Sequence, residues 1–212
     1  MKKFDRVKAV VSVDAIADNF EEMKKNIAEG TKIGAGIKAD GYGHGAEASA
    51  RLIEDYEYIW GYATATPEEA LQLRDAGIDK PILILGIVFE EYSKELIAHE
   101  VRLTVCEYEM AAALSEEAVR QGKQVHIHIG LDTGMSRIGF ADVPESVETI
   151  KKIADLPNVE IEGMFTHFAR ADETDRSPAI TQLNRYLAFA ELLEKAGVEI
   201  PMKHCSNSAG II

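Results

Sequence analysis

A lysine, a tyrosine and a histidine lie close together in the glycine-rich stretch AGIKADGYGHGAE, residues 35–47. Lys38 ends a short apolar run, and Tyr42 and His44 stand in the turn-rich segment that follows. A lysine at the end of a strand is usually solvated. An amine that is desolvated beside other cations has a lowered pKa, however, and can form a Schiff base with an aldehyde. The chemistry open to Lys38 therefore depends on its neighbours.

Three later apolar runs also end in polar side chains. These residues are Asp132 and Arg137 in LDTGMSRIGF, His167 and Asp172 in THFARAD, and His204, Asn207 and Ser208 in HCSNSAG. An arginine in a glycine-flanked turn can hydrogen-bond a phenolate or a carboxylate. A helix N-terminus opened by the residues SNSAG offers N–H groups to a phosphate. Aldehyde, phosphate and phenolate occur together in pyridoxal 5′-phosphate, whose ring is an electron sink for carbanions, so these residues point to that cofactor.

The elements that must position these residues alternate regularly between strand and helix. The predicted strands are Lys32–Ile37, Tyr58–Tyr62, Pro81–Leu85, Val101–Val105, Lys123–Gly130, Val159–Thr166 and Ile200–Cys205. Helical patterns separate them; one opens at an N-cap, Asp14, and another at Thr66 followed by Pro67. Such alternation favours right-handed βαβ units and a parallel α/β sheet. We predict a closing (β/α)8 barrel of the TIM type, with an open doubly wound sheet as the alternative.

The strand count falls one short of a barrel. Strand seven ends at Cys205, and the chain stops at Ile212. A barrel without its eighth strand has two open parallel edges, so we expect a barrel truncated after strand seven. We also expect the opening run Ala9–Val13 to be a strand that pairs with absent material. In barrels of this kind the chemistry lies at the C-terminal ends of the strands, where the polar residues above are found.

Composition excludes several classes of partner. The net charge is −13, which argues against nucleic acid and anionic membranes. No apolar run reaches transmembrane length. The two cysteines, Cys106 and Cys205, show neither metal-ligand spacing nor a disulfide framework, which favours a reducing cytoplasm. His126 and His128 alternate on one strand without a carboxylate or cysteine at ligand spacing. We interpret them as polar residues lining the barrel and predict no metal site.

Four motifs resemble those of alanine racemases, the bacterial enzymes that interconvert L- and D-alanine. They are IKADGYGHG (Ile37–Gly45), DTGMSRIGF, GMFTHFARAD and HCSNSAG, in the family's order, and the resemblance extends from about Ala9 to the last residue. It implies a barrel that binds pyridoxal phosphate, followed by a β-rich domain, in a head-to-tail homodimer. On this reading residues 1–13 form a strand that pairs with the absent β-domain, and residues 14–212 form the incomplete barrel.

The resemblance also assigns roles residue by residue. Lys38 would carry the Schiff base and act as one of two catalytic bases. Arg137 would bind the phenolic oxygen of the cofactor and the substrate carboxylate, and His167 would lie beside the ring. The remaining expected contacts are those of Tyr42 and Ser208 with the phosphate, Asn207 near it, Leu85 on the cofactor, and His204 orienting an arginine of strand eight.

Two departures from the family pattern affect this reading. The eighth strand and the β-domain, which supplies the tyrosine base on the opposite face of the substrate, are missing, so the 212 residues alone are expected to be inactive. The family also commonly has a lysine, often carbamylated, where this chain has Gly130. We hypothesise that another carboxylate or a bound anion orients Arg137 instead.

Several functions are compatible with these residues. The leading one is racemisation of L-alanine to D-alanine, a precursor of peptidoglycan. A racemase of another small amino acid, such as serine, would share the same barrel. A stand-alone barrel that binds pyridoxal phosphate without catalysis is an alternative of a different class. Related barrel decarboxylases and a catalytically empty interaction domain are disfavoured, because four motifs converge on the strand ends.

Overall fold

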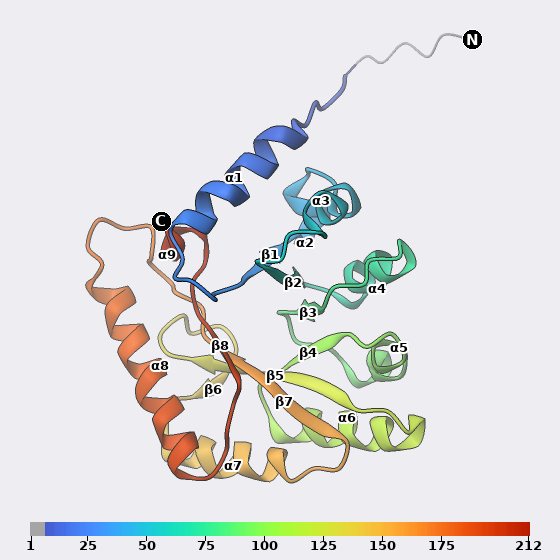
Figure 1. The fold of residues 1–212 in the computed structure, drawn as a ribbon. Coiled ribbons are helices and arrows are strands. Elements are labelled where there is room, and N and C mark those ends of the chain that lie inside the picture. The colour runs from blue at the N-terminus through green and yellow to red at the C-terminus, as the bar shows by residue number, and fades with distance from the viewer. Residues whose placement is uncertain (1–6) are drawn as a thin grey trace.

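The computed structural model describes residues 7–212 (Figure 1). Within these residues the strands are β1 (Ile33–Gly36), β2 (Ile59–Thr64), β3 (Ile82–Ile84), β4 (Arg102–Val105), β5 (Val125–Asp132), β6 (Phe140–Ala141), β7 (Val159–Phe165) and β8 (Met202–His204). The helices are α1 (Val13–Lys25), α2 (Lys38–Tyr42), α3 (Ala46–Ile53), α4 (Pro67–Asp75), the 3-10 helix η1 (Glu90–Tyr92), α5 (Ser93–Ala98), α6 (Tyr108–Gln121), α7 (Pro144–Ala154), α8 (Ser177–Lys195) and α9 (Ser208–Ile211). The predicted alternation of strands and helices is confirmed.

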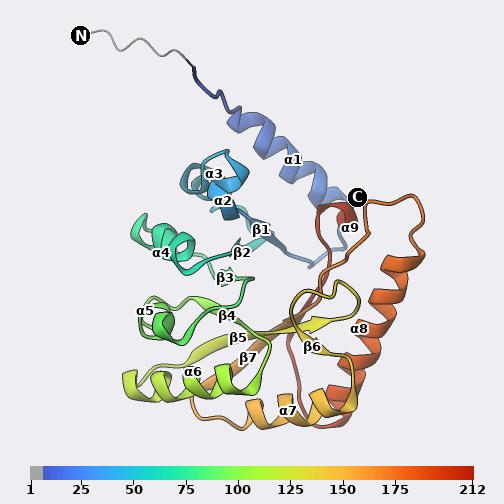
Figure 2. The ribbon, with the colours of Figure 1, turned by 180° about the vertical axis from the view of Figure 1, so that it is seen from behind.

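The strands pair in the order of the chain. The path is β1-β2-β3-β4-β5-β7-β8, every pair is parallel, and the two-residue β6 pairs with β5 outside it. A doubly wound sheet reverses its strand order at a switch point, so the sequential order excludes that alternative. Helices α3 to α8 form an arc around the strands (Figures 1 and 2). Within the described residues β8 and β1 are not paired, and the sheet is an open arc of a (β/α) barrel.

Two helix starts show how the sequence sets local structure. α4 begins as predicted, because the Thr66 hydroxyl accepts a hydrogen bond from the N–H of Glu69 at 3.4 Å and Pro67 occupies the first turn. α1 begins earlier than predicted: its cap is Ser12, whose hydroxyl accepts from the N–H of Ala15 at 3.3 Å. Asp14 therefore lies inside the first turn, where its carboxylate interacts favourably with the helix dipole.

The N-terminal segment has no regular structure before α1 in the described residues. Residues 7–12 form neither helix nor strand, and Val13 is the first residue of α1 rather than the last of a strand. A strand needs partners for its backbone groups, and within residues 7–212 the run Ala9–Val13 pairs with no strand. Residues 1–6, which were assigned to the same segment, lie outside the described residues. The pairing of residues 1–13 with a further domain stays a prediction.

The core is built from apolar strands that are buried on both faces, as in other parallel sheets. All three residues of β3 are buried, and aliphatic side chains from the helices pack against the outside of the sheet. Two buried tyrosines fix helices to strands through their hydroxyl groups. Tyr62 donates to the Ala50 carbonyl oxygen at 2.7 Å, and Tyr186 donates to the Met164 carbonyl oxygen at 2.7 Å. Both phenols thereby satisfy the hydrogen-bonding demand of a buried polar group.

A chain of polar residues crosses the inside of the sheet, and we call it the interior polar chain. Arg102 Nε lies 3.3 Å from Glu162 Oε2, and the same oxygen lies 3.1 Å from His128 Nε2. His128 Nδ1 lies 2.9 Å from His204 Nε2. His128 is fully buried, which confirms that it lines the barrel. Gly163 makes room for its ring, because a Cβ there would lie 2.6 Å from the imidazole.

Gly163→Ala should therefore destabilise the fold. The added methyl group must displace the His128 ring and disturb its hydrogen bonds, so we expect a loss of about 1–3 kcal/mol in the free energy of unfolding. Urea denaturation measures this change. Gly36→Ala is the matched control, since a Cβ at this strand glycine meets nothing within 4 Å. Equal stability of the two variants would contradict the packing argument.

Candidate functional site

The predicted site residues lie at one edge of the sheet, because all strands are parallel and their C-terminal ends meet there. We call this edge the rim. The rim carries Lys38 and Tyr42 after β1, Leu85 after β3, Arg137 in the loop between β5 and β6, His167 after β7, and Asn207 and Ser208 at the start of α9. The topology therefore brings the sequence-predicted residues to the same end of the arc.

The chain leaves β1 through a left-handed helical turn. Ala39, Asp40 and Tyr42 have φ angles of 51°, 52° and 55°, and Gly41 between them has 61°. The turn closes through its own backbone, since the N–H of Gly43 donates to the carbonyl of Ala39 at 3.1 Å. Left-handed helix costs L-residues about 1–2 kcal/mol each. The sequence predicted an ordinary turn here, so this strained conformation is a correction.

Two carboxylates support the left-handed turn. Asp40 Oδ1 accepts from the N–H of Ala46 at 2.8 Å, which joins the turn to the start of α3. Glu69 Oε1 accepts from the N–H of Ala39 at 2.7 Å, and Glu69 Oε2 accepts from the N–H of Ala65 at 2.8 Å. Hydrogen bonds to charged groups contribute about 1.5–3 kcal/mol each, which is the order of the backbone strain. Sequence reasoning missed Glu69.

The turn places Lys38 and Tyr42 side by side. The Nζ atom of Lys38 lies 6.0 Å from the centroid of the Tyr42 ring, and Tyr42 is 63% exposed. His44 is engaged within the turn itself, because its Nδ1 atom lies 2.8 Å from the carbonyl oxygen of Gly41. The amine and the phenol are therefore the groups of this motif that a ligand at the rim can reach.

Lys38 and Arg137 supply positive charge to the rim, and the imidazole of His167 lies near both. Burial lowers the pKa of the His167 imidazole, and the nearby positive charges of Arg137 and Lys38 lower it further. His167 is therefore neutral at pH 7. Among residues 7–212 none of the three forms an ion pair with a carboxylate, and two cations beside a neutral imidazole form an environment that favours an anionic ligand. The proposed cofactor, with its phosphate and phenolate, fits this charge pattern.

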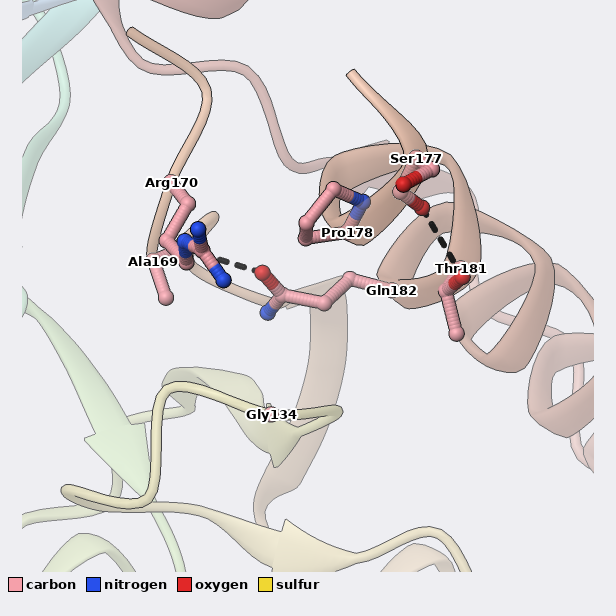
Figure 3. Close-up of a pocket in the computed structure, with 7 residues that line it drawn as sticks. All are labelled: Gly134, Ala169, Arg170, Ser177, Pro178, Thr181 and Gln182. Atoms are coloured by element: carbon pink, nitrogen blue, oxygen red, sulfur yellow. Dashed lines mark hydrogen bonds between the residues drawn. The ribbon is translucent and has the colours of Figure 1, made fainter. Parts of the chain in front are cut away.

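Helix α8 holds the two loops that carry Arg137 and His167. Gln182 is 5% exposed and reaches between the loops: its Oε1 accepts from the N–H of Ala169 at 2.9 Å (Figure 3), and its Nε2 donates to the His167 carbonyl at 3.0 Å. One turn later, Arg185 Nη1 donates to the Thr133 carbonyl at 2.9 Å. Sequence reasoning missed Gln182, because an amide within a helix gives no local signal of a distant partner.

The loop after β5 is closed by its own aspartate. Asp132 Oδ1 accepts from the N–H groups of Gly134 at 2.9 Å and Ser136 at 3.0 Å, which confirms its predicted stapling role. At Gly130 a Cβ would lie 3.1 Å from Cys106 Sγ. Burial raises the pKa of that thiol to about 11, so Cys106 is neutral and supplies no anion. The anion expected beside Arg137 stays a prediction.

The last rim residues are arranged around α9. Asn207 Oδ1 accepts from the N–H of Gly210 at 3.0 Å as the helix cap, and its Nδ2 donates to the Phe168 carbonyl at 3.3 Å. Ser208 is exposed at the first position of the helix, as the sequence predicted for SNSAG. Leu85 is half-buried beyond β3. The contacts of these residues with a cofactor stay predictions.

Among residues 7–212, no three histidine, cysteine, aspartate or glutamate side chains gather in a way that could hold a metal ion. Over the same residues, no helix combines the length and apolarity needed to cross a membrane.

The sequential parallel sheet and its cationic rim define a (β/α)-barrel domain of the type whose chemistry lies at the strand ends. The comparisons identify its family. Residues 11–212 match the model described as "Alanine racemase, N-terminal domain", and the chain belongs to that family. The family assignment confirms both the resemblance and the barrel class predicted from the sequence.

Named relatives agree with this assignment. The chain is 42% identical over 205 residues to an alanine racemase of Methanococcus maripaludis, covering 96% of this chain and 54% of the relative. It is 41% identical over 204 residues to an alanine racemase of Clostridium tetani, covering 96% of this chain and 52% of the relative. The chain thus spans about half the length of the curated relatives it matches.

Solved structures show the same correspondence. An alanine racemase of Clostridium difficile 630 superposes with a TM-score of 0.91 at 40% identity, over 93% of this chain and 52% of that one. A histidine racemase of Leuconostoc mesenteroides superposes with a TM-score of 0.85 at 27% identity, over 94% of this chain and 52% of that one.

The interior polar chain should make the fold sensitive to acid. Burial alone raises the pKa of the Glu162 carboxyl, but hydrogen bonds and charge from His128 and Arg102 outweigh it and lower this pKa to about 2. Burial, followed by the neighbouring His128, lowers the pKa of His204 from 6.5 to about 3. At intermediate pH both groups therefore bind fewer protons when the chain is folded than when it is unfolded.

Stability should accordingly fall as the pH drops below 6.5, where unfolded His204 takes up a proton and folded His204 does not. Glu162 adds to this loss below about 4.5, the usual pKa of its carboxyl. His204→Gln removes the first contribution, so between pH 6.5 and 4.5 its stability should depend on pH less steeply, by up to about 1.4 kcal/mol per pH unit. Denaturation series at several pH values measure this slope. Parallel curves for the two proteins would contradict the assignment.

Proposed function

We propose that this chain is the cofactor-binding part of a pyridoxal-phosphate-dependent alanine racemase, an isomerase. The observation that carries the proposal is the convergence of Lys38, Arg137 and His167 on one rim of a barrel of the alanine racemase family. An amine, a guanidinium and a neutral imidazole are the groups that an aldehyde cofactor with an anionic phenol requires.

The chain's own residues would hold the cofactor as follows. Lys38 Nζ would bind the aldehyde carbon, and Arg137 would donate to the phenolic oxygen and bind the substrate carboxylate. His167 lies beside the ring, and because it is neutral it adds no further positive charge. The remaining contacts are those of Tyr42 and Ser208 with the phosphate, Asn207 near it, and Leu85 with the apolar part of the cofactor.

The reaction requires proton movement at the substrate Cα. When bound, pyridoxal phosphate supplies the electron sink that stabilises negative charge on this carbon. Lys38, Arg137 and His167 form the proposed catalytic set. Lys38 would take up or return the proton on one face of the substrate Cα. Arg137 holds the substrate carboxylate and so fixes the orientation of the Cα–H bond.

The opposite face depends on residues outside this chain. The domain division that we propose has residues 1–13 pairing with a β-rich domain and residues 14–212 forming the barrel portion. That β-domain would supply a tyrosine base across a homodimer interface. An eighth barrel strand, which is not β8 but lies outside these 212 residues, would supply an arginine that His204 orients. Because one base alone cannot exchange protons on both faces, the 212 residues by themselves are expected to be inactive.

Alanine is the proposed substrate because the named relatives at about 40% identity are alanine racemases. A histidine racemase superposes on the same portion, so the same barrel also serves other amino acids. Another small amino acid such as serine therefore stays the alternative substrate. Initial rates of racemisation of L-alanine and L-serine by the whole protein, followed by optical rotation, decide between them.

A cytoplasmic location is part of the proposal. Cys106 and Cys205 are both free thiols, in keeping with a reducing compartment. The third alternative, a barrel that binds pyridoxal phosphate without turnover, predicts attachment of the cofactor but no exchange of the Cα proton of any amino acid by the whole protein.

Attachment to Lys38 is the direct test of the proposed function. With pyridoxal phosphate the amine adds to the aldehyde and water leaves; borohydride then delivers hydride to the carbon–nitrogen double bond and fixes one adduct. We expect intact-mass analysis to show this adduct on the wild type and peptide mapping to place it on Lys38. Lys38→Ala should abolish it, a loss of more than about tenfold at equal concentration.

The control for this test is Lys32→Ala, which removes an exposed lysine just before β1 and should leave the adduct intact. His167→Ala should also keep attachment while weakening the activity of the whole protein. An adduct that persists in Lys38→Ala would refute the role of this lysine.

A further inference from the structure

Glu69 links the ends of two neighbouring strands through its carboxylate. One oxygen accepts from the N–H of Ala39, the residue next to Lys38, at 2.7 Å. The other accepts from the N–H of Ala65, the residue that follows β2, at 2.8 Å. Glu69 itself lies in the first turn of α4. A single side chain thus ties the backbone beside the amine to both β2 and α4.

The helix α4 does not need this carboxylate. Glu69 stands three residues after the cap Thr66, the spacing of a capping box, in which the glutamate would bond the backbone N–H of the cap residue. Its carboxylate instead bonds the preceding residue, Ala65, and the distant Ala39. The Thr66 hydroxyl and Pro67 already serve the helix end. The hydrogen bond from Ala39 to Glu69 therefore serves a part of the structure other than α4.

The part of the structure that needs this hydrogen bond is the left-handed turn after β1. Asp40 stabilises its own left-handed backbone through Ala46, and Gly41 adopts positive φ without strain. Ala39 has φ 51° and ψ 50° and carries no polar side chain of its own. Its N–H lies at the start of the turn, where no backbone carbonyl of the turn can accept it. Glu69 is the group that satisfies it.

We propose that Glu69 is a positioning residue for Lys38: its carboxylate holds Ala39 in the left-handed conformation and so aims the amine at the ligand. The proposal rests on the proposed function, in which Lys38 carries the cofactor. Glu69 touches neither cofactor nor substrate in this account. It acts on the backbone immediately after the reactive residue, across thirty positions of sequence.

Glu69→Gln is the sharpest test, because the amide keeps the shape of the side chain but offers only one acceptor oxygen to two donors. The matched control is Glu68→Gln, which removes a neighbouring carboxylate bonded to Tyr92 and not to the turn. We expect the apparent affinity for pyridoxal phosphate, measured by borohydride-trapped adduct at Lys38, to fall about tenfold in Glu69→Gln. Glu68→Gln should match the wild type.

Two further measurements separate positioning from general stability. The backbone amide of Ala39 should shift upfield in the proton–nitrogen correlation spectrum of Glu69→Gln, because it loses a charged acceptor. Tyr186→Phe, which removes a buried hydrogen bond in α8 far along the chain, provides a destabilised protein with an intact turn. Attachment per folded molecule should be normal in Tyr186→Phe and reduced in Glu69→Gln.

The outcomes distinguish the two proposals. A wild-type protein that forms no adduct at Lys38 would refute the proposed function. A wild-type adduct at Lys38 together with wild-type affinity in Glu69→Gln would overturn the role of Glu69 alone. An equal loss in Glu69→Gln and Tyr186→Phe would also overturn it, since the effect would then follow stability. Glu69→Ala adds a check, because full removal of the acceptor should weaken attachment at least as much as the amide.

Discussion

The parallel hydrogen-bonded ladder is the constraint on which the rest of this structure depends. Each strand pairs with the next strand in the chain, so each βα connection returns the backbone to the same starting end. All C-terminal strand ends then lie on one rim, whatever residues occupy them. Lys38, Arg137 and His167 are separated by about a hundred positions of sequence or by a whole βα unit, and only this ladder brings them together. The strand order therefore decides which loops meet at the rim, and the side chains on those loops then decide which chemistry is possible there.

Polar side chains from outside the rim hold the loops that the parallel sheet brings together. Glu69 on α4 holds the turn after β1, and on α8 Gln182 holds the loop after β7 while Arg185 holds the loop after β5. Below the rim, Glu162 and His128 connect β4, β5, β7 and β8 through the interior polar chain. Glu69 and Gln182 bond backbone groups of the loops, whereas Glu162 and His128 bond other polar side chains in the partly buried interior.

Local sequence predicted the elements well because each is governed by local rules. Apolar runs of the right length became buried strands, and Thr66 with Pro67 became a helix start. The left-handed turn was missed because Ala39 and Tyr42 carry no preference for positive φ; the conformation is imposed by Glu69 and by the strand ends. Pairs such as His128 with Glu162 were missed for another reason. Their meeting depends on the register between β5 and β7, which periodicity does not determine.

The left-handed turn also bears on how this chain can change over generations. A side chain branched at Cβ collides with its own backbone when φ is positive, so valine, isoleucine and threonine are poor replacements at Ala39 and Tyr42. Ala39 contributes no reactive group, yet its positive φ restricts which side chains can replace it. At Ala39 the backbone geometry of the turn, rather than any reactive group, therefore sets which substitutions the fold can accept.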